Sequence, residues 1–206
     1  PKKGAFEPFA CGTGDLRGAT PLWVAAYDMN GAGGQVFSVG TSRTTSSAET
    51  LHTLLDAGGD QHLTTADGTT PFMAAAGLGR ATYTPREPRG VRSPSAEEAV
   101  RVLLAAGADI NATNEADFSA LHGAAFRGLN EVIELLVAEG ADIDARDFRG
   151  RTPYRMAEGS KQSFQFQSWP ETAALLQQLG ADTTLGIPGT VQERLRDVPV
   201  NTSAQP

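Results

Sequence analysis

The chain of 206 residues contains 40% hydrophobic and 20% charged residues and has a formal net charge of −7 at pH 7. Such an acidic chain lacks the basic face that nucleic acids and anionic membranes require, which argues against both as the main partner. There is no apolar run of about eighteen residues, so no transmembrane helix is predicted, and the single cysteine, Cys11, excludes an intramolecular disulfide.

A short Gly-x-Asp phrase recurs four times along the chain. Its copies are Gly58-Gly59-Asp60, Gly107-Ala108-Asp109, Gly140-Ala141-Asp142 and Gly180-Ala181-Asp182. The third copy follows the second by 140 − 107 = 33 residues, and the other spacings are longer. We interpret this as a unit of 33 residues with insertions in some copies. Self-similarity at such a period predicts a stacked repeat array.

A second phrase confirms the register of the repeat. Its copies are Thr20-Pro21-Leu22, Thr70-Pro71-Phe72, Ser119-Ala120-Leu121 and Thr152-Pro153-Tyr154, and small residues follow each copy. Thr or Ser can cap a helix N-terminus, and Pro fits the first helical position. These two phrases resemble the ankyrin repeat over roughly residues 15–182. The resemblance implies an all-α, ankyrin-type solenoid of stacked helix-turn-helix units with β-hairpin-like turns.

The predicted organisation has four units between two flanking segments. The N-terminal segment, 1–14, is rich in turn residues, and the C-terminal segment, 183–206, is expected to be a mobile tail with one short helix at most, from Thr190. The predicted units are unit one, 15–60; unit two, 61–109; unit three, 110–142; and unit four, 143–182.

The start of the chain leaves two interpretations open. Trp23, Val24 and Tyr27 are large for the exposed end of a repeat array. Residues 1–14 are therefore either the remnant of a preceding repeat or a segment that folds back as a cover. Because the first residue is Pro1 and not Met, we expect a processed chain or a fragment. The compartment stays open: a cytoplasmic location is favoured slightly, beside a secreted or periplasmic one.

Each unit is expected to contain a second, more apolar helix. The predicted ranges are Glu49–Ala57, Glu98–Ala106, Glu131–Val137 and Glu171–Leu179. Capping-box spacing supports two of the starts, at Ser46-x-x-Glu49 and Ser95-x-x-Glu98.

Three inserted loops are predicted between first and second helices, at 29–47, 80–94 and 159–169. The second loop is rich in arginine, and the third carries Phe164, Phe166 and Trp169. One hypothesis is that the loops form a second binding surface. The other is that they are tolerated insertions, because the cost of loop closure grows slowly with length. Exposed aromatic residues in the third loop favour a surface that covers something.

The ankyrin resemblance implies a non-catalytic module that binds another protein through hairpin tips and the inner-helix face. Aromatic residues and arginines are common at binding hot spots, and they gather in the third and fourth units. We therefore expect a monomer that binds an acidic or mixed-charge protein surface. The alternative is that the arginines at the hairpin tips only form a face in contact with solvent. The predicted partner-binding residues are Phe118, Phe126, Arg127, Arg146, Phe148, Arg149 and Arg151.

The sequence contains no recognisable catalytic, cofactor-binding or metal-binding set of residues. The three histidines lie in different repeat contexts, and His122 is expected to make structural hydrogen bonds near a helix start. Asp117 stands where the family has Gly and is expected to tolerate a left-handed turn position. Asp109, Asp142 and Asp182 recur with the repeat, as turn residues do. The alternative function is a regulatory or scaffolding fragment of a larger enzyme or effector.

Overall fold

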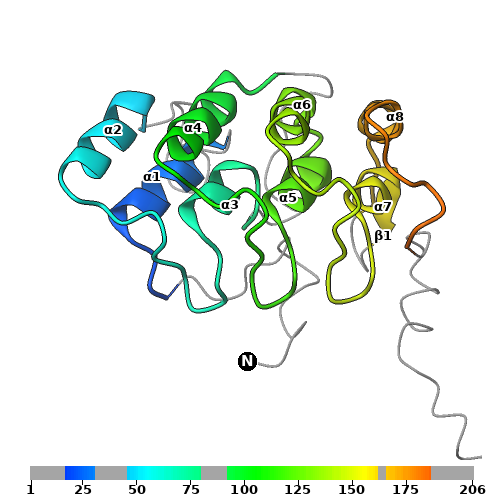
Figure 1. Ribbon diagram of the computed structural model, residues 1–206, viewed down its shortest axis with the longest axis horizontal. Coiled ribbons are helices and arrows are strands. Elements are labelled where there is room, and N and C mark those ends of the chain that lie inside the picture. The colour runs from blue at the N-terminus through cyan, green and yellow to red at the C-terminus, as the bar shows by residue number, and fades with distance from the viewer. Residues whose placement is uncertain (1–16, 31–45, 80–91, 162–165, 187–206) are drawn as a thin grey trace, which may run out of the picture.

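The computed structural model describes residues 17–30, 46–79, 92–161 and 166–186. The N-terminal segment with Cys11, most of the three inserted loops, and the tail beyond 186 with its expected helix at Thr190 lie outside the described residues. Within the described ranges, the chain forms four helix pairs that follow one another along the long axis of the molecule (Figure 1).

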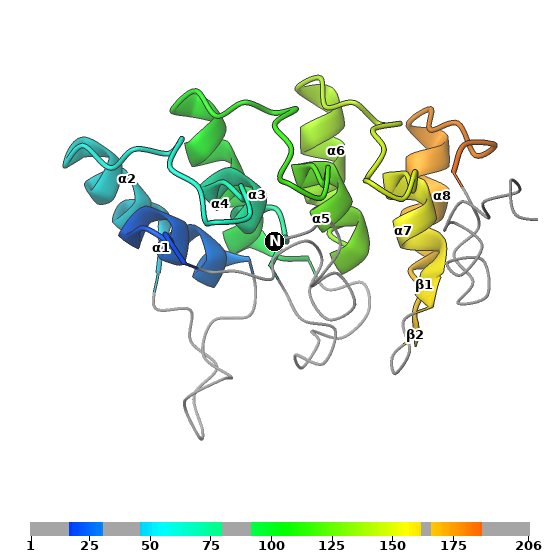
Figure 2. The same ribbon diagram turned by 90° about the horizontal axis from the view of Figure 1, so that it is seen from below.

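The first helices form one row and the second helices form another, and the hairpin-like turns project from the row of first helices (Figures 1 and 2). The pairs are α1 (Pro21–Met29) with α2 (Ala48–Asp56), α3 (Pro71–Ala75) with α4 (Pro94–Ala105), α5 (Ala120–Arg127) with α6 (Asn130–Ala138), and α7 (Pro153–Gly159) with α8 (Pro170–Gln178). The predicted solenoid of helix pairs is therefore confirmed.

The first helices begin as the sequence predicts. The Thr20 and Thr70 hydroxyls accept hydrogen bonds from the backbone N–H groups of Trp23 (3.1 Å) and Met73 (3.2 Å). Pro follows directly at the first helical position in α1 and α3, where its missing N–H leaves no hydrogen bond unmade.

The two predicted capping boxes are wrong. In α2 the cap is Ser47, whose hydroxyl accepts from the Thr50 N–H, one residue later than predicted. Helix α4 begins at Pro94, which the prediction had left in the inserted loop, and the Ser93 side chain makes no cap bond. The fixed φ of Pro suits the first helical turn, and here it sets the helix start in place of a capping box.

The core lies between the two rows of helices. Both rows contribute alanines and larger apolar side chains to it. Fully buried examples are Ala26, Ala75, Ala124 and Ala157 on the first helices and Leu51, Leu103, Leu136 and Leu176 on the second. Alanine lets neighbouring units approach closely, and the larger buried side chains of both rows remove apolar area from water.

Consecutive units are joined by backbone hydrogen bonds between their turns. The Ala66 N–H donates to the Arg17 carbonyl (2.7 Å), and the Glu115 N–H donates to the Asp67 carbonyl (2.9 Å). The third bond of this row runs from the Phe148 N–H to the Ala116 carbonyl (3.1 Å). These turns contain no strand, apart from an isolated antiparallel bridge between Thr113 and Ser119. The described strands lie elsewhere, where β1 (Ser160–Lys161) pairs with β2 (Phe166–Gln167) between α7 and α8.

The two tryptophans are buried, and for Trp169 this differs from the sequence prediction. Trp23 is only 2% exposed, because its indole lies against unit two and Nε1 donates to the Thr69 carbonyl (3.1 Å). Trp169, predicted on an aromatic loop surface, is 8% exposed and donates from Nε1 to the Phe126 carbonyl (2.8 Å). Its ring lies against Gly128, where an added Cβ would approach Trp169 Cδ2 to 2.8 Å. The two indole rings therefore fill contacts between units. Among Trp23, Val24 and Tyr27, only Val24 is mostly exposed to solvent, at 53%.

Candidate protein-binding surface

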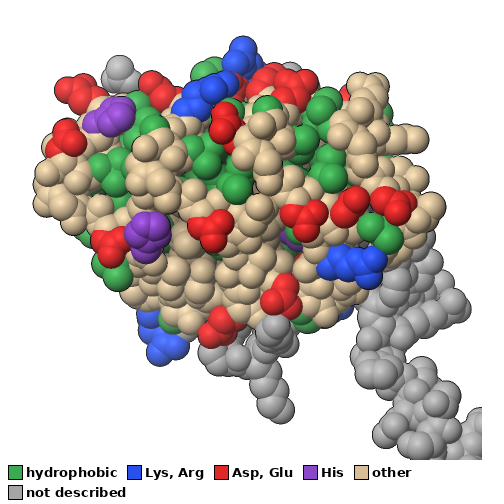
Figure 3. All heavy atoms as spheres, in the orientation of Figure 1, with side chains coloured by type: hydrophobic (Ala, Val, Ile, Leu, Met, Phe, Trp, Pro, Cys, Tyr) green, Lys and Arg blue, Asp and Glu red, His purple; other side chains and the backbone are tan. Residues whose placement is uncertain are grey.

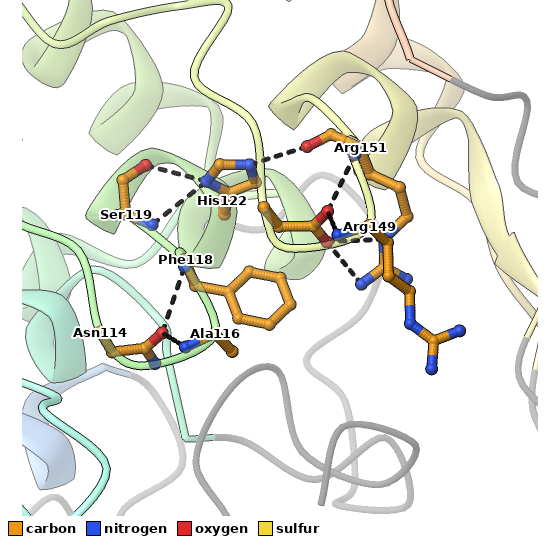
Figure 4. Close-up of polar contacts among 8 residues, drawn as sticks. Asn114, Ala116, Phe118, Ser119, His122, Arg149 and Arg151 are labelled. Atoms are coloured by element: carbon orange, nitrogen blue, oxygen red, sulfur yellow. Dashed lines mark hydrogen bonds and ion pairs between the residues drawn. The ribbon is translucent and has the colours of Figure 1, made fainter. Parts of the chain in front are cut away.

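The turn of unit four is held by one buried carboxylate. Asp147 Oδ1 accepts hydrogen bonds from the backbone N–H groups of Arg149 (2.9 Å) and Arg151 (2.8 Å). Its other oxygen, Oδ2, pairs with the Arg151 guanidinium through Nε (2.7 Å) and Nη2 (2.6 Å), as Figure 4 shows. Asp147 and Arg151 are 4% and 3% exposed. A charge pair with both members buried and hydrogen-bonded fixes the backbone between them.

His122 connects this turn to unit three. The Ser119 N–H lies 3.2 Å from His122 Nδ1 and can only donate, so Nδ1 is the acceptor. The ring hydrogen is then on Nε2, which donates to the Arg151 carbonyl (3.1 Å). Burial lowers the pKa of His122, although nearby Asp147 partly opposes this shift, so the ring is neutral. His122 has the structural role that the sequence predicts.

Other residues at the same helix position make comparable contacts to the next unit. Trp23 replaces the histidine in unit one and donates to the Thr69 carbonyl, which corresponds in register to the Arg151 carbonyl. In unit four, Arg155 donates from Nε to the Leu185 carbonyl (3.0 Å) and from Nη2 to the Thr183 carbonyl (2.8 Å). Residues 183–186 are therefore held against α7, whereas the sequence had placed them in a mobile tail.

Three of the predicted partner-binding residues are buried, contrary to the predicted surface. Phe118, Phe126 and Arg151 are 0%, 2% and 3% exposed. Asp117 takes the predicted left-handed conformation, with φ of 59°. The next side chain, Phe118, lies inside, edge-on to His122 at 5.6 Å, with the Arg151 guanidinium 5.8 Å from its ring centroid. The apolar residue at this turn thus fills the contact between units three and four.

The other four predicted residues are partly or fully exposed, and three of them lie on one turn. Arg146 is exposed, and Phe148 and Arg149 are half-buried, with the Arg149 guanidinium 5.2 Å from the Phe148 ring centroid. In Figure 3, basic side chains gather near the turn that leads into α7, on a face where carboxylates are otherwise spread out. The structure therefore brings together Arg146, Phe148 and Arg149.

Arg127 lies apart from that turn, at the other end of α5. Its Nη2 donates to the Asn30 carbonyl in unit one (3.4 Å), so the side chain crosses unit two. Gly77 makes this path possible, because a Cβ at that position would lie 2.9 Å from Arg127 Cγ. Arg127 therefore links units one and three, and it does not belong to the turn surface.

Comparisons with known proteins agree with this architecture. Residues 99–157 match the family described as "Ankyrin repeats (many copies)", and residues 67–115 match the family described as "Ankyrin repeat". The chain therefore contains ankyrin repeats over residues 67–157.

Two curated proteins are similar in sequence to part of this chain. Serine/threonine-protein kinase 12 of Arabidopsis thaliana is 40% identical over 57 residues, which are 28% of this chain and 12% of the kinase. Protein phosphatase 1 regulatory subunit 27 of Mus musculus is 33% identical over 92 residues, which are 45% of this chain and 55% of that subunit. The chain thus spans a small part of one relative and about half of the other. Ankyrin repeats imply protein–protein interaction and are generally non-catalytic.

The residues that order the turns of this ankyrin-repeat protein were not predicted from the sequence. Asn114 Oδ1 accepts from the N–H groups of Ala116 (3.0 Å) and Phe118 (3.1 Å), as Asp147 does one unit later. The spacing of 147 − 114 = 33 residues was a usable signal, because a short acceptor side chain recurs there just before the turn.

The recurring aspartates of the ankyrin-repeat protein are turn residues, as predicted. Asp109 Oδ1 accepts from the Asn111 N–H (3.0 Å), Asp142 Oδ1 from the Asp144 N–H (3.0 Å), and Asp182 Oδ1 from the Thr184 N–H (2.8 Å).

The described residues contain neither a metal-binding cluster nor a membrane-spanning helix. Over 17–30, 46–79, 92–161 and 166–186, no group of three His, Cys, Asp or Glu side chains could hold a metal ion. Across the same ranges, no helix is both long and apolar enough to cross a membrane.

Proposed function

We propose that this ankyrin-repeat protein is a non-catalytic module that binds another protein through its hairpin turns and its inner-helix face. The observation that carries the proposal is the ordered turn of unit four, which presents Phe148 and Arg149 above a buried Asp147–Arg151 pair. A surface that is ordered before binding loses less conformational entropy when the partner docks.

The chemistry of the turn favours an acidic partner. Arg146 is exposed, and Arg149 is half-buried against the Phe148 ring. Guanidinium groups bind carboxylates with good geometry, and aromatic and Arg side chains dominate binding hot spots. The inner-helix face contributes exposed Glu158 and half-buried Arg127. We expect the module to act as a monomer.

The proposal is tested by cross-linking in the source lysate. A photoreactive amino acid replaces Phe148, and the cross-linked proteins are compared with and without the Arg146→Glu change. The matched control is Arg17→Glu, which reverses another exposed arginine, in unit one and away from the unit-four turn. We expect a protein that is cross-linked in the control and lost with Arg146→Glu. Equal cross-linking in both variants would remove the turn from the binding surface.

A second candidate is a regulatory or scaffolding part of a larger enzyme or effector. The observation that favours it is the kinase match, in which the shared 57 residues make up only 12% of the kinase. The test is the intact mass of the native protein in its source. A mass equal to that of the 206-residue chain would reject this candidate, and a larger mass with a catalytic domain in the same chain would support it.

A further inference from the structure

The second helices of units two and three enclose a groove of about 480 Å³. It lies on the row of helices away from the turn of unit four, and Figure 3 shows acidic and basic side chains gathered over α4 and α6 there. The lining residues are Arg92, Glu97, Arg101, Glu131, Glu134, Leu135, Ala138 and Glu139. Four carboxylates and two guanidiniums leave the groove with a net negative charge.

Helix α6 supplies both the apolar floor and the acidic rim. Glu134, Leu135, Ala138 and the C-cap residue Glu139 follow Glu131 by 3, 4, 7 and 8 positions, the spacings that place side chains on one helix face. Leu135 is nearly buried, at 8% exposed, and Ala138 leaves room above it. The stem of a long basic side chain could lie on this floor, with its charged end at the rim.

Helix α4 already holds one guanidinium in the groove. Arg92 donates from Nε to Glu97 Oε1 (2.5 Å) and from Nη2 to Glu97 Oε2. Glu97 is 6% exposed, whereas the Arg92 side chain is 61% exposed. The hydrogen bond to Arg92 lowers the pKa of Glu97, so this carboxylate is ionised at neutral pH. In the described part of the chain, Glu131, Glu134 and Glu139 make no such ion pair.

We propose that this groove binds a short basic segment of a partner protein. Its Arg or Lys side chains would meet Glu131, Glu134 and Glu139, and their stems would pack on Leu135 and Ala138. Charge complementarity identifies the occupant, since the lining carries an excess of carboxylate over guanidinium. The turn of unit four favours an acidic partner, so the two surfaces bind segments of opposite charge and can be tested separately.

The test uses the whole 206-residue chain and a fluorescent octa-arginine peptide, whose binding is followed by anisotropy at low and moderate salt. The Glu131→Gln, Glu134→Gln variant removes two rim charges. The matched control, Glu98→Gln with Glu171→Gln, removes two exposed charges from α4 and α8 outside the groove. We expect about tenfold weaker binding for the rim variant and less than about twofold for the control.

A variant without a charge change completes the test. Ala138→Trp fills the groove from an exposed helix position and should also weaken peptide binding, while melting curves verify that each variant folds. Equal weakening in the rim and control variants would overturn the proposal, because attraction by net charge would then explain the binding. Unchanged binding in Ala138→Trp would overturn it as well. Self-association that disappears in the rim variant would assign the groove to a second copy of this chain and reject a separate partner.

Discussion

Arg151→Met is expected to remove about 3 kcal/mol of unfolding free energy, because it leaves the Asp147 carboxylate buried without its counter-charge. The Asp147 side chain is fully buried and the Arg151 side chain is 4% exposed, so water cannot replace the lost partner. The value falls at the low end of the range of about 3–5 kcal/mol for such pairs. Asp147 still accepts the N–H groups of Arg149 and Arg151 in this variant.

The pair is isolated by a double-mutant cycle. Asp147→Asn keeps the Oδ1 acceptor and removes the charge, so alone it leaves the Arg151 guanidinium unpaired. The double variant contains neither charge and should cost at least about 2 kcal/mol less than the sum of the two single changes. Glu158→Gln is the control, because its pair with Arg155 is 40% exposed on the carboxylate side and should contribute no more than about 1 kcal/mol.

The assay is urea unfolding followed by circular dichroism, with amide hydrogen exchange on α7 and α8. Repeat units contact only their neighbours, so unit four can open before the others, and exchange detects this directly. Additive costs in the cycle, or a loss below about 1 kcal/mol for Arg151→Met, would show that the ion pair is not formed in solution. The described order of the unit-four turn would then have to rest on its backbone bonds alone.

Three further changes test the contacts between units and the core. Gly128→Ala should cost about 2 kcal/mol and alter tryptophan fluorescence, since Gly128 has φ of 71° and its added Cβ would clash with Trp169. The pKa of His122 is lowered in the folded state, so protons bind the unfolded chain preferentially. The free energy of unfolding should therefore fall as the pH drops below about 6.5, by at most about 1.4 kcal/mol per pH unit. The His122→Gln variant should lose this pH dependence. Leu136 is fully buried, so Leu136→Ala should lower the free energy of unfolding in urea by about 2–5 kcal/mol. Val24 is 53% exposed, so Val24→Ala should change it by no more than about 0.5 kcal/mol. Equal losses in the two variants would contradict the register of the repeat.

The starts of α1 and α3 and the Gly-x-Asp turns could be read from the sequence because their causes are local, whereas the starts of α2 and α4 could not. A Thr-Pro pair determines where α1 and α3 begin, and the Gly-x-Asp phrase forms the same turn each time it occurs. The left-handed position of Asp117 was predictable for the same reason. These features depend on a few neighbouring residues, which the repeat displays several times in register.

The direction of individual side chains was not predictable, because it depends on contacts between distant residues. Phe118 sits at a turn, where an apolar residue suggests an exposed binding position, but its ring fills the space beside His122 and Arg151. Arg127 reaches Asn30, 97 residues earlier, and only the missing side chain at Gly77 opens that path. A pattern of residue types does not show which neighbouring unit offers the space.

Buried residues order the unit-four turn, and under the proposed function they would act on binding indirectly, through that order. Asp147 and Arg151 fix the backbone on either side of Phe148 and Arg149, and His122 ties that backbone to unit three. If the turn binds a partner, Arg151→Met should weaken binding mainly by disordering this segment. The test is amide hydrogen exchange of the turn with and without the partner. If the variant has lost order and not a contact, partner binding should increase the protection of the turn more in the variant than in the wild type.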